Sequence, residues 1–168
     1  VSYNVTLGKR YPISRVDYVL PSRGEFSEVF LKDTSRMSFK TGDFLSEAAL
    51  ETESERSSSV MRNEGFFDFN KNHYFFQADT LSDRNSAALT VTVNEYTRNE
   101  SVREATPIRR YFIDKIEISY PKTLNIREKV LRDLTTVYPG QMHSEDAVNS
   151  TYSRLSALKI FSTVNIGM

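Results

Sequence analysis

The second half of the chain repeats the pattern of the first half at a nearly fixed spacing. Four pairs of matched residues lie 98 positions apart: Gly42 and Gly140, Ser46 and Ser144, Glu47 and Glu145, and Ala49 and Ala147. A further pair, Phe66 and Phe161, lies 95 positions apart, which places a three-residue gap within or just after the second helix of the repeat. Such self-similarity predicts two copies of one supersecondary unit in tandem.

The first copy reads as strand, helix, helix, strand, strand. Apolar residues at helical spacing predict a helix over 25–36, and Ser46 is a suitable N-cap for a second helix that runs to about Asn63 and stops at Gly65. That second helix has a thin apolar face, so we expect it to be partly exposed. Strands are predicted at three places: 11–20, about 74–78, and 87–96, where the alternation is clearest.

The second copy restarts this order and ends before a third strand. A strand is predicted over 110–120 and another over 160–168. Between them we expect a helix capped at Asn125, with Glu128 as its capping-box partner, a Pro-Gly turn, and a helix capped at Ser144. The second copy therefore lacks the counterpart of strand 87–96, and we expect this to leave an unpaired backbone edge that a neighbouring chain could cover.

The predicted fold class is α+β, with tandem β-α-α-β-β modules. Each module would be a three-stranded sheet with two helices packed on one face, because three strands cannot cover helices on both sides. The predicted organisation is a first module at 8–97, a linker at 98–108 and a second module at 109–168, truncated before its final strand.

Composition argues against several classes of function. The 22 basic residues balance the 22 acidic residues, so no basic excess favours nucleic acid as a partner, and the absence of cysteine excludes disulfides and Cys-based metal sites. His73 and His143 have no ligand-like partners at metal spacing and are expected to be surface or half-buried residues. No phosphate-binding loop, nucleophile elbow or zinc-protease motif occurs. We therefore predict no catalytic residue, no metal and no cofactor.

The second helix of the first copy is unusually polar. Ser57, Ser58 and Ser59 interrupt it, and Glu53, Glu55 and Arg56 are spaced so that they could form an ion-pair cluster. The alternative interpretation, a solvated helix face, stays open at this point.

An open sheet edge is the feature that could bind a partner. An extended peptide can add to such an edge as a further strand, with affinity supplied by main-chain hydrogen bonds. The candidate edge of the first copy is the aromatic strand Tyr74, Phe75, Phe76 and Gln77. The corresponding residues of the second copy are Phe161, Val164 and Ile166. The alternative is that these side chains only fill the core.

Two stretches resemble the POTRA domains of the BamA/TamA outer-membrane assembly family, in versions found in Bacteroidetes-type bacteria. The segment at 55–80, with its Asn-x-Gly-Phe-Phe-x-Phe run, resembles the approach to the second POTRA strand, and 109–166 resembles a POTRA opening with its Pro-Gly turn. Ser57–Ser59 and the absent final strand depart from the family pattern. The resemblance implies a segment at the periplasmic face of the outer membrane that guides client proteins to a C-terminal β-barrel.

Three functions remain in competition. The first is a binding module that holds unfolded outer-membrane proteins or accessory subunits by strand addition. The second is a spacer that positions the barrel and docks partner subunits. The third is an enzyme with a carboxylate pair hidden in the sequence, which no motif supports. Contact with a membrane would come only through a barrel outside this chain.

Overall fold

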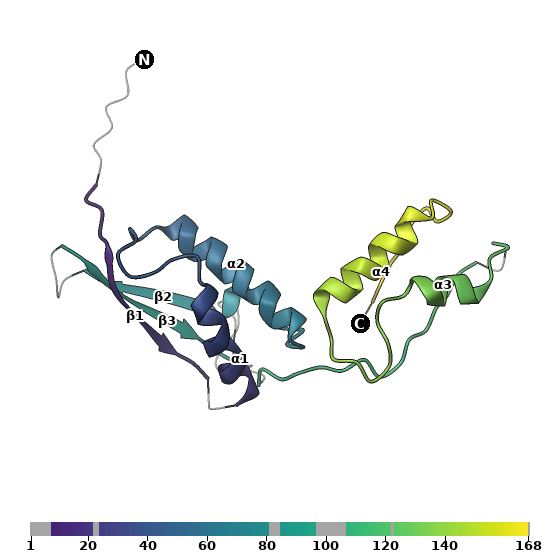
Figure 1. The fold of residues 1–168 in the computed structure, drawn as a ribbon, viewed down its shortest axis with the longest axis horizontal. Coiled ribbons are helices and arrows are strands. Elements are labelled where there is room, and N and C mark those ends of the chain that lie inside the picture. The colour runs from purple at the N-terminus through teal and green to yellow at the C-terminus, as the bar shows by residue number, and fades with distance from the viewer. Residues whose placement is uncertain (1–7, 22–23, 81–84, 97–106, 122, 168) are drawn as a thin grey trace, which may run out of the picture. The chain divides into compact units, whose positions relative to one another are not determined.

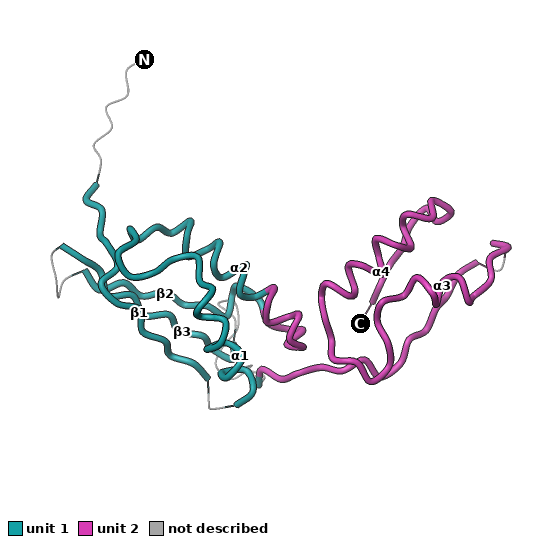
Figure 2. Tube along the Cα trace, in the orientation of Figure 1, with its two compact units in different colours: residues 1–58, 70–107 teal, residues 59–69, 108–168 magenta. Residues whose placement is uncertain are grey.

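The computed structural model describes residues 8–21, 24–80, 85–96, 107–121 and 123–167. The chain divides into two compact units, which Figure 2 distinguishes by colour. The first unit comprises 1–58 and 70–107, and the second comprises 59–69 and 108–168. Within the described parts of the chain, no helix is long and apolar enough to span a membrane. The module limits predicted from the sequence stay a prediction.

The first unit has the predicted element order (Figure 1). Helix α1 continues directly into the 3-10 turn η1, and α2 begins one residue after Ser46 and ends two residues before Gly65, whose φ is +92°. The final turn of α2 is assigned to the second unit. The elements are β1 (Ile13–Val19), α1 (Glu25–Asp33), η1 (Thr34–Arg36), α2 (Glu47–Asn63), η2 (Lys71–His73), β2 (Tyr74–Asp79) and β3 (Ala87–Val93).

The last strand of the first unit lies at the centre of its sheet. The strand order is β1-β3-β2, with β3 parallel to β1 and antiparallel to β2. Leu89, Val91 and Val93 are at most 1% exposed, whereas Thr90 and Thr92 on the opposite face are half-buried. The alternation that made this the clearest strand in the sequence therefore marks the strand with a neighbour on each side.

Both helices of the first unit pack on the same face of the sheet. The ring of Phe30 on α1 lies 6.1 Å from the ring of Tyr74 on β2, and the Tyr74 hydroxyl donates a hydrogen bond of 2.8 Å to Ser57 on α2. One side chain on β2 thus contacts both helices. Phe30 and Tyr74 are each 1% exposed, so this contact lies in the core. The predicted two-layer α+β arrangement is confirmed.

The expectation that α2 is partly exposed is confirmed, since Glu51, Thr52 and Glu55 are exposed, but several of its other polar residues are buried. Glu53, Ser57 and Ser58 are each 1% exposed, and Ser54 is 4% exposed. The buried hydroxyl of Ser57 has a partner in the core, because the Tyr74 hydroxyl donates to it. A polar pattern in the sequence gave no sign of these tertiary partners.

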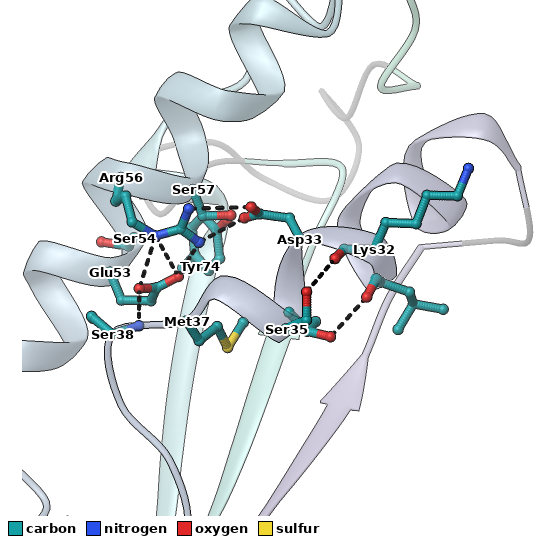
Figure 3. Close-up of polar contacts among 12 residues, drawn as sticks. Lys32, Asp33, Ser35, Met37, Ser38, Glu53, Ser54, Arg56, Ser57 and Tyr74 are labelled. Atoms are coloured by element: carbon teal, nitrogen blue, oxygen red, sulfur yellow. Dashed lines mark hydrogen bonds and ion pairs between the residues drawn. The ribbon is translucent and has the colours of Figure 1, made fainter.

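A buried ion cluster joins α1, the following loop and α2 (Figure 3). The Arg56 guanidinium lies 2.6 Å from a carboxylate oxygen of Asp33 and 2.6 Å from one of Glu53. The backbone N–H of Ser38 donates to the other Glu53 oxygen at 2.8 Å. Glu53 and Arg56 therefore form the ion-pair cluster that the sequence left open, whereas Glu55 pairs at the surface with Lys71.

Besides the last turn of α2, the described residues of the second unit form two helices, α3 (Glu128–Leu134) and α4 (Glu145–Ala157). Ser144 caps α4 as predicted, because its side chain accepts the N–H of Ala147. The predicted cap at Asn125 is wrong, since α3 begins at Glu128 with Arg127 at the N-cap and no side-chain cap bond.

The strands predicted over 110–120 and 160–168 do not form in the described part of the second unit. The structure shows only an isolated bridge between Phe112 and Met142. In the first unit β1 and β2 do not pair with each other, because each pairs with β3 between them. The corresponding segments of the second unit have no such central partner among the described residues, so they form no ladder.

Candidate functional site

Strand β2 is an outer strand of the first unit's sheet. Within the described residues it pairs with β3 on one side, from Tyr74 opposite Val93 to Asp79 opposite Ala88. Its other side is therefore an edge that presents backbone donors and acceptors. This is the strand that the sequence singled out as the binding edge.

The register of β2 and β3 determines which β2 residues present their backbone at that edge. The N–H of Asn94 donates to the carbonyl of His73 at 3.0 Å, which makes His73 and Asn94 a hydrogen-bonded pair. In an antiparallel ladder such pairs alternate, so Phe75 and Gln77 bond to β3. The N–H and C=O groups of Phe76 and Ala78 then point away from β3, toward the edge.

The side chains of β2 pass from the core to the surface along the strand. Tyr74 is 1% exposed and belongs to the core, and burial raises the pKa of its hydroxyl. Phe75 and Phe76 are half-buried on opposite faces: Phe76 stacks on Tyr74 with ring centres 5.9 Å apart, and Phe75 lies 5.9 Å from Tyr96. From Gln77 onward the side chains are exposed. Of the four predicted residues, Tyr74 can thus contribute to the edge only through its backbone.

A charged bridge lies where the chain enters β2. The Lys71 ammonium is 2.9 Å from a carboxylate oxygen of Glu51 and 2.7 Å from one of Glu55, both on α2. Hydrogen bonds with Glu55 and then Glu51 raise the pKa of Lys71. This bridge links the start of the strand to the helix beside it.

The second unit has a groove of about 280 Å³. Phe161, Val164 and Ile166, predicted as the edge of the second copy, belong to its lining. Residues 115–120 and Ile113 line it too. Helices α3 and α4 contribute Leu131, Val148, Thr151 and Leu155 to the lining.

By comparison with the first unit, this groove is central rather than peripheral. In the order of elements, the segments 113–120 and 161–167 take the places that β1 and β2 have in the first unit, and in the first unit β3 lies between those two strands. The expected edge of the second unit is therefore an apolar groove between two segments. Its lining is suited to a strand whose alternate side chains are apolar.

Both histidines are more buried than expected. His73 is 7% exposed, with its Nδ1 3.0 Å from the carbonyl oxygen of Asn94, and His143 is 3% exposed. Burial lowers the pKa of His143, with Arg62 lowering it further and Glu145 opposing. In the described ranges no cluster of three or more His, Cys, Asp or Glu side chains could hold a metal ion.

Comparison with known proteins gives matches of structure only. No protein-family model matches the sequence, and no curated protein matches it. The fold is similar to a crystal structure of POTRA domains 3–5 of BamA from Haemophilus influenzae, with a TM-score of 0.57 and 14% identity over 92% of this chain and 53% of that one. It is also similar to BamA from Haemophilus ducreyi lacking POTRA domains 1–3, with a TM-score of 0.65 and 16% identity over 94% of this chain and 26% of that one.

These similarities show that the chain has the fold of POTRA domains, as its sequence motifs indicated. The chain spans about half of the first of these two structures and about a quarter of the second.

Proposed function

We propose that this POTRA-fold chain is a non-catalytic, protein-binding part of a BamA-type assembly protein at the periplasmic face of the bacterial outer membrane. Its partners would be unfolded outer-membrane proteins, which it holds by adding one of their strands to its own sheet. The similarity to BamA POTRA domains supports the protein class. The edge of β2 supports the manner of binding.

The observation that carries this proposal is the outward backbone of Phe76 and Ala78. An incoming strand would exchange hydrogen bonds with these two residues, while β3 keeps those of Phe75 and Gln77. The half-buried Phe76 ring supplies an apolar contact for one client side chain. Because backbone bonds carry most of the affinity, this mode suits clients that share alternating β-strands rather than one motif.

The test uses a proline to remove one edge donor. Ala78→Pro eliminates an N–H that points away from β3, so the sheet should keep its ladder, since proline is tolerated on the open side of an edge strand. We expect peptides from outer-membrane β-strands, titrated by NMR, to shift the amides of β2 in the parent and to bind Ala78→Pro about tenfold more weakly.

Ala78→Val is the matched control, because it keeps the N–H and has a high strand propensity. It should bind peptides as the parent does. If Ala78→Pro folds and binds as tightly as Ala78→Val, strand addition at this edge is wrong.

A second candidate function is the docking of partner subunits by the second unit. Three large side chains on its helices and the loop between them are exposed: Val130 on α3 at 42%, Tyr138 in the loop at 60% and Tyr152 on α4 at 49%. Aromatic residues of this kind are enriched in protein interfaces. Replacing Tyr138 and Tyr152 with Ser should abolish capture of accessory assembly subunits and leave peptide binding at β2 unchanged. If subunit capture survives both replacements, this docking role is wrong.

A further inference from the structure

In the second unit, the end of helix α2 and the loop after it pack against residues near 110 and 145. We call these the receiving residues, and the segment that packs on them the received segment. The received segment is 59–69, which comprises the last turn of α2 and the Gly-Phe-Phe loop. The N–H of Tyr111 donates to the carbonyl of Gly65 at 2.9 Å, and the Arg110 guanidinium lies over the Phe66 ring at 5.2 Å. A Cβ on Gly65 would come within 2.8 Å of Met142, so the contact is close.

Charged and polar bonds complete this contact at the start of α4. Arg62 donates to Glu145 at 2.8 Å, and Ser59 donates to the same carboxylate at 3.0 Å. The side-chain oxygen of Asn63 accepts from the Ser144 hydroxyl and from the N–H of Asp146. Burial would raise the pKa of Glu145, but the bonds from Arg62 and Ser59 outweigh it and hold this pKa below its usual value.

Four of the receiving residues recur in the first unit with the same identities, whereas Phe44 stands in the place of Met142. Arg110-Tyr111 corresponds to Arg10-Tyr11 at 100 positions, and Ser144-Glu145 corresponds to Ser46-Glu47 at 98 positions. Chance would not readily preserve these two dipeptides among the positions that make the contact.

The backbone that carries these residues also has the same geometry in both units. In the first unit Ile13 donates to Asp43, Gly42 donates to Ile13, and Leu45 donates to Tyr11. The second unit has the same three bonds: Ile113 to Gln141, Gly140 to Ile113, and His143 to Tyr111. The receiving residues are therefore held in the same way in the two units.

The same positions differ in exposure. Glu145, Ser144 and Met142 are half-buried beneath segment 59–69, whereas Glu47, Ser46 and Phe44 in the first unit are exposed, Phe44 at 56%. The Arg10 guanidinium lies over the Phe44 ring at 5.8 Å, while Arg110 lies over the received Phe66. Among its described residues, the first unit thus presents a similar receiving surface without the segment that covers it in the second.

We propose that Arg10, Tyr11, Phe44, Ser46 and Glu47 form a docking surface for another module of this type. The module would lie ahead in the same polypeptide and present its equivalent of segment 59–69. An Arg at the end of its helix would pair with Glu47, and the carbonyl of its loop glycine would accept the N–H of Tyr11. The surface is separate from the β2 edge, so the proposal does not depend on client binding.

The test supplies such a module. Residues 10–109 are duplicated in tandem, so that 1–109 is followed directly by 10–168 and the second Arg10 takes the place of Arg110. We expect the amide of the second Tyr11 to exchange about tenfold more slowly than Tyr11 of the parent chain, because it gains a buried hydrogen-bond acceptor. Glu47→Arg in the receiving copy should remove this protection.

A charge swap separates direct contact from a general loss of structure. Arg62→Glu in the first copy, combined with Glu47→Arg in the second copy, should restore at least part of the protection. Glu28→Arg is the matched control, because Glu28 is also an exposed acid in the first turn of a helix and should leave the protection intact. If the duplicated chain folds and its second Tyr11 exchanges as in the parent, or if Glu28→Arg acts as strongly as Glu47→Arg, the proposal is wrong.

Discussion

The turn before the second helix and the sheet beneath it differ in how they form in the two units. The turns at 42–47 and 140–145 have the same three backbone hydrogen bonds, to the segments 11–13 and 111–113 respectively, and the same Ser-Glu start of a helix. The sheet, by contrast, is complete in the first unit and forms no ladder among the described residues of the second. The hydrogen bonds of the turn therefore form in both copies of the repeat, whereas the sheet requires a central strand that pairs with the segments on both sides of it.

A hydrogen bond from the loop after the first helix to a side chain of the second helix recurs in both units with different acceptors. In the first unit the N–H of Ser38 donates to Glu53 of α2 at 2.8 Å, and in the second the N–H of Thr136 donates to Thr151 of α4 at 2.9 Å. Both pairs of positions are 98 apart. A neutral hydroxyl needs no counter-charge, whereas the buried carboxylate of Glu53 is balanced by Arg56. The acceptor thus stands at the same position of the repeat in both units, and a charged acceptor such as Glu53 requires a partly buried counter-charge as well.

The largest expected effect tests the central strand. Val91→Asp in β3 should lower the free energy of unfolding of the first unit by ~4 kcal/mol or more, because a carboxylate would be buried without a partner. Val164→Asp, in the groove of the second unit, should cost less than ~1 kcal/mol because Val164 is half-buried on an open groove. Hydrogen exchange at increasing urea, resolved by segment, measures both. Equal losses would contradict the contrast between the two sheets.

The next largest effect tests the buried ion cluster of Asp33, Glu53 and Arg56. Arg56→Met should destabilise the first unit by ~2–4 kcal/mol, because it leaves Asp33 and Glu53 buried without their cation. This range allows for solvent screening, since the Arg56 side chain is 29% exposed. Glu53→Thr, which copies Thr151 of the second unit, should cost less, since Arg56 keeps Asp33. Urea denaturation followed by circular dichroism gives both values.

The exposed bridge of Lys71 serves as the control for this pair of variants. Lys71→Met removes a cation that also contacts two carboxylates, but at the surface, so the urea midpoint should change little. If Lys71→Met is as damaging as Arg56→Met, burial is not what gives the cluster its importance.

The sequence predicted best those features that are determined by neighbouring residues. The cap at Ser144, the stop at Gly65 and the strand around Val91 all follow from local patterns and are all confirmed. The cap at Asn125 failed although it too was local, because α3 begins three residues later, at Glu128.

Features that depend on tertiary partners could not be predicted in the same way. The burial of Ser57 depends on Tyr74, which lies 17 positions away, and the absence of strands at 110–120 and 160–167 depends on a third segment that must pair with both. For the candidate site, the strand predicted at about 74–78 is confirmed as an outer strand, and its role as a binding edge stays a prediction. Which backbone groups face outward, those of Phe76 and Ala78, required the register with β3.

The smallest expected effect concerns pH and uses one position at which the two turns differ. His143 of the second unit corresponds to Leu45 of the first, at 98 positions, and burial lowers the pKa of His143 in the folded chain. Below the unfolded value of 6.5, the unfolded chain binds a proton that the folded chain resists. The stability of the second unit should therefore decrease as the pH falls through that range, and no such term arises at Leu45.

His143→Leu tests this assignment by giving the second unit the residue of the first. The His143 ring of the parent lies 5.0 Å from the Phe67 ring, and leucine can partly replace this apolar contact. Urea midpoints of the second unit, measured from about pH 7.5 to about pH 5.5, should decrease in the parent and stay nearly level in the variant. Glu145 is protonated only at lower pH, where Arg62 and Ser59 lose their shared acceptor in parent and variant alike. A parent and variant that decline equally above about pH 5.5 would show that a group other than His143 takes up the proton.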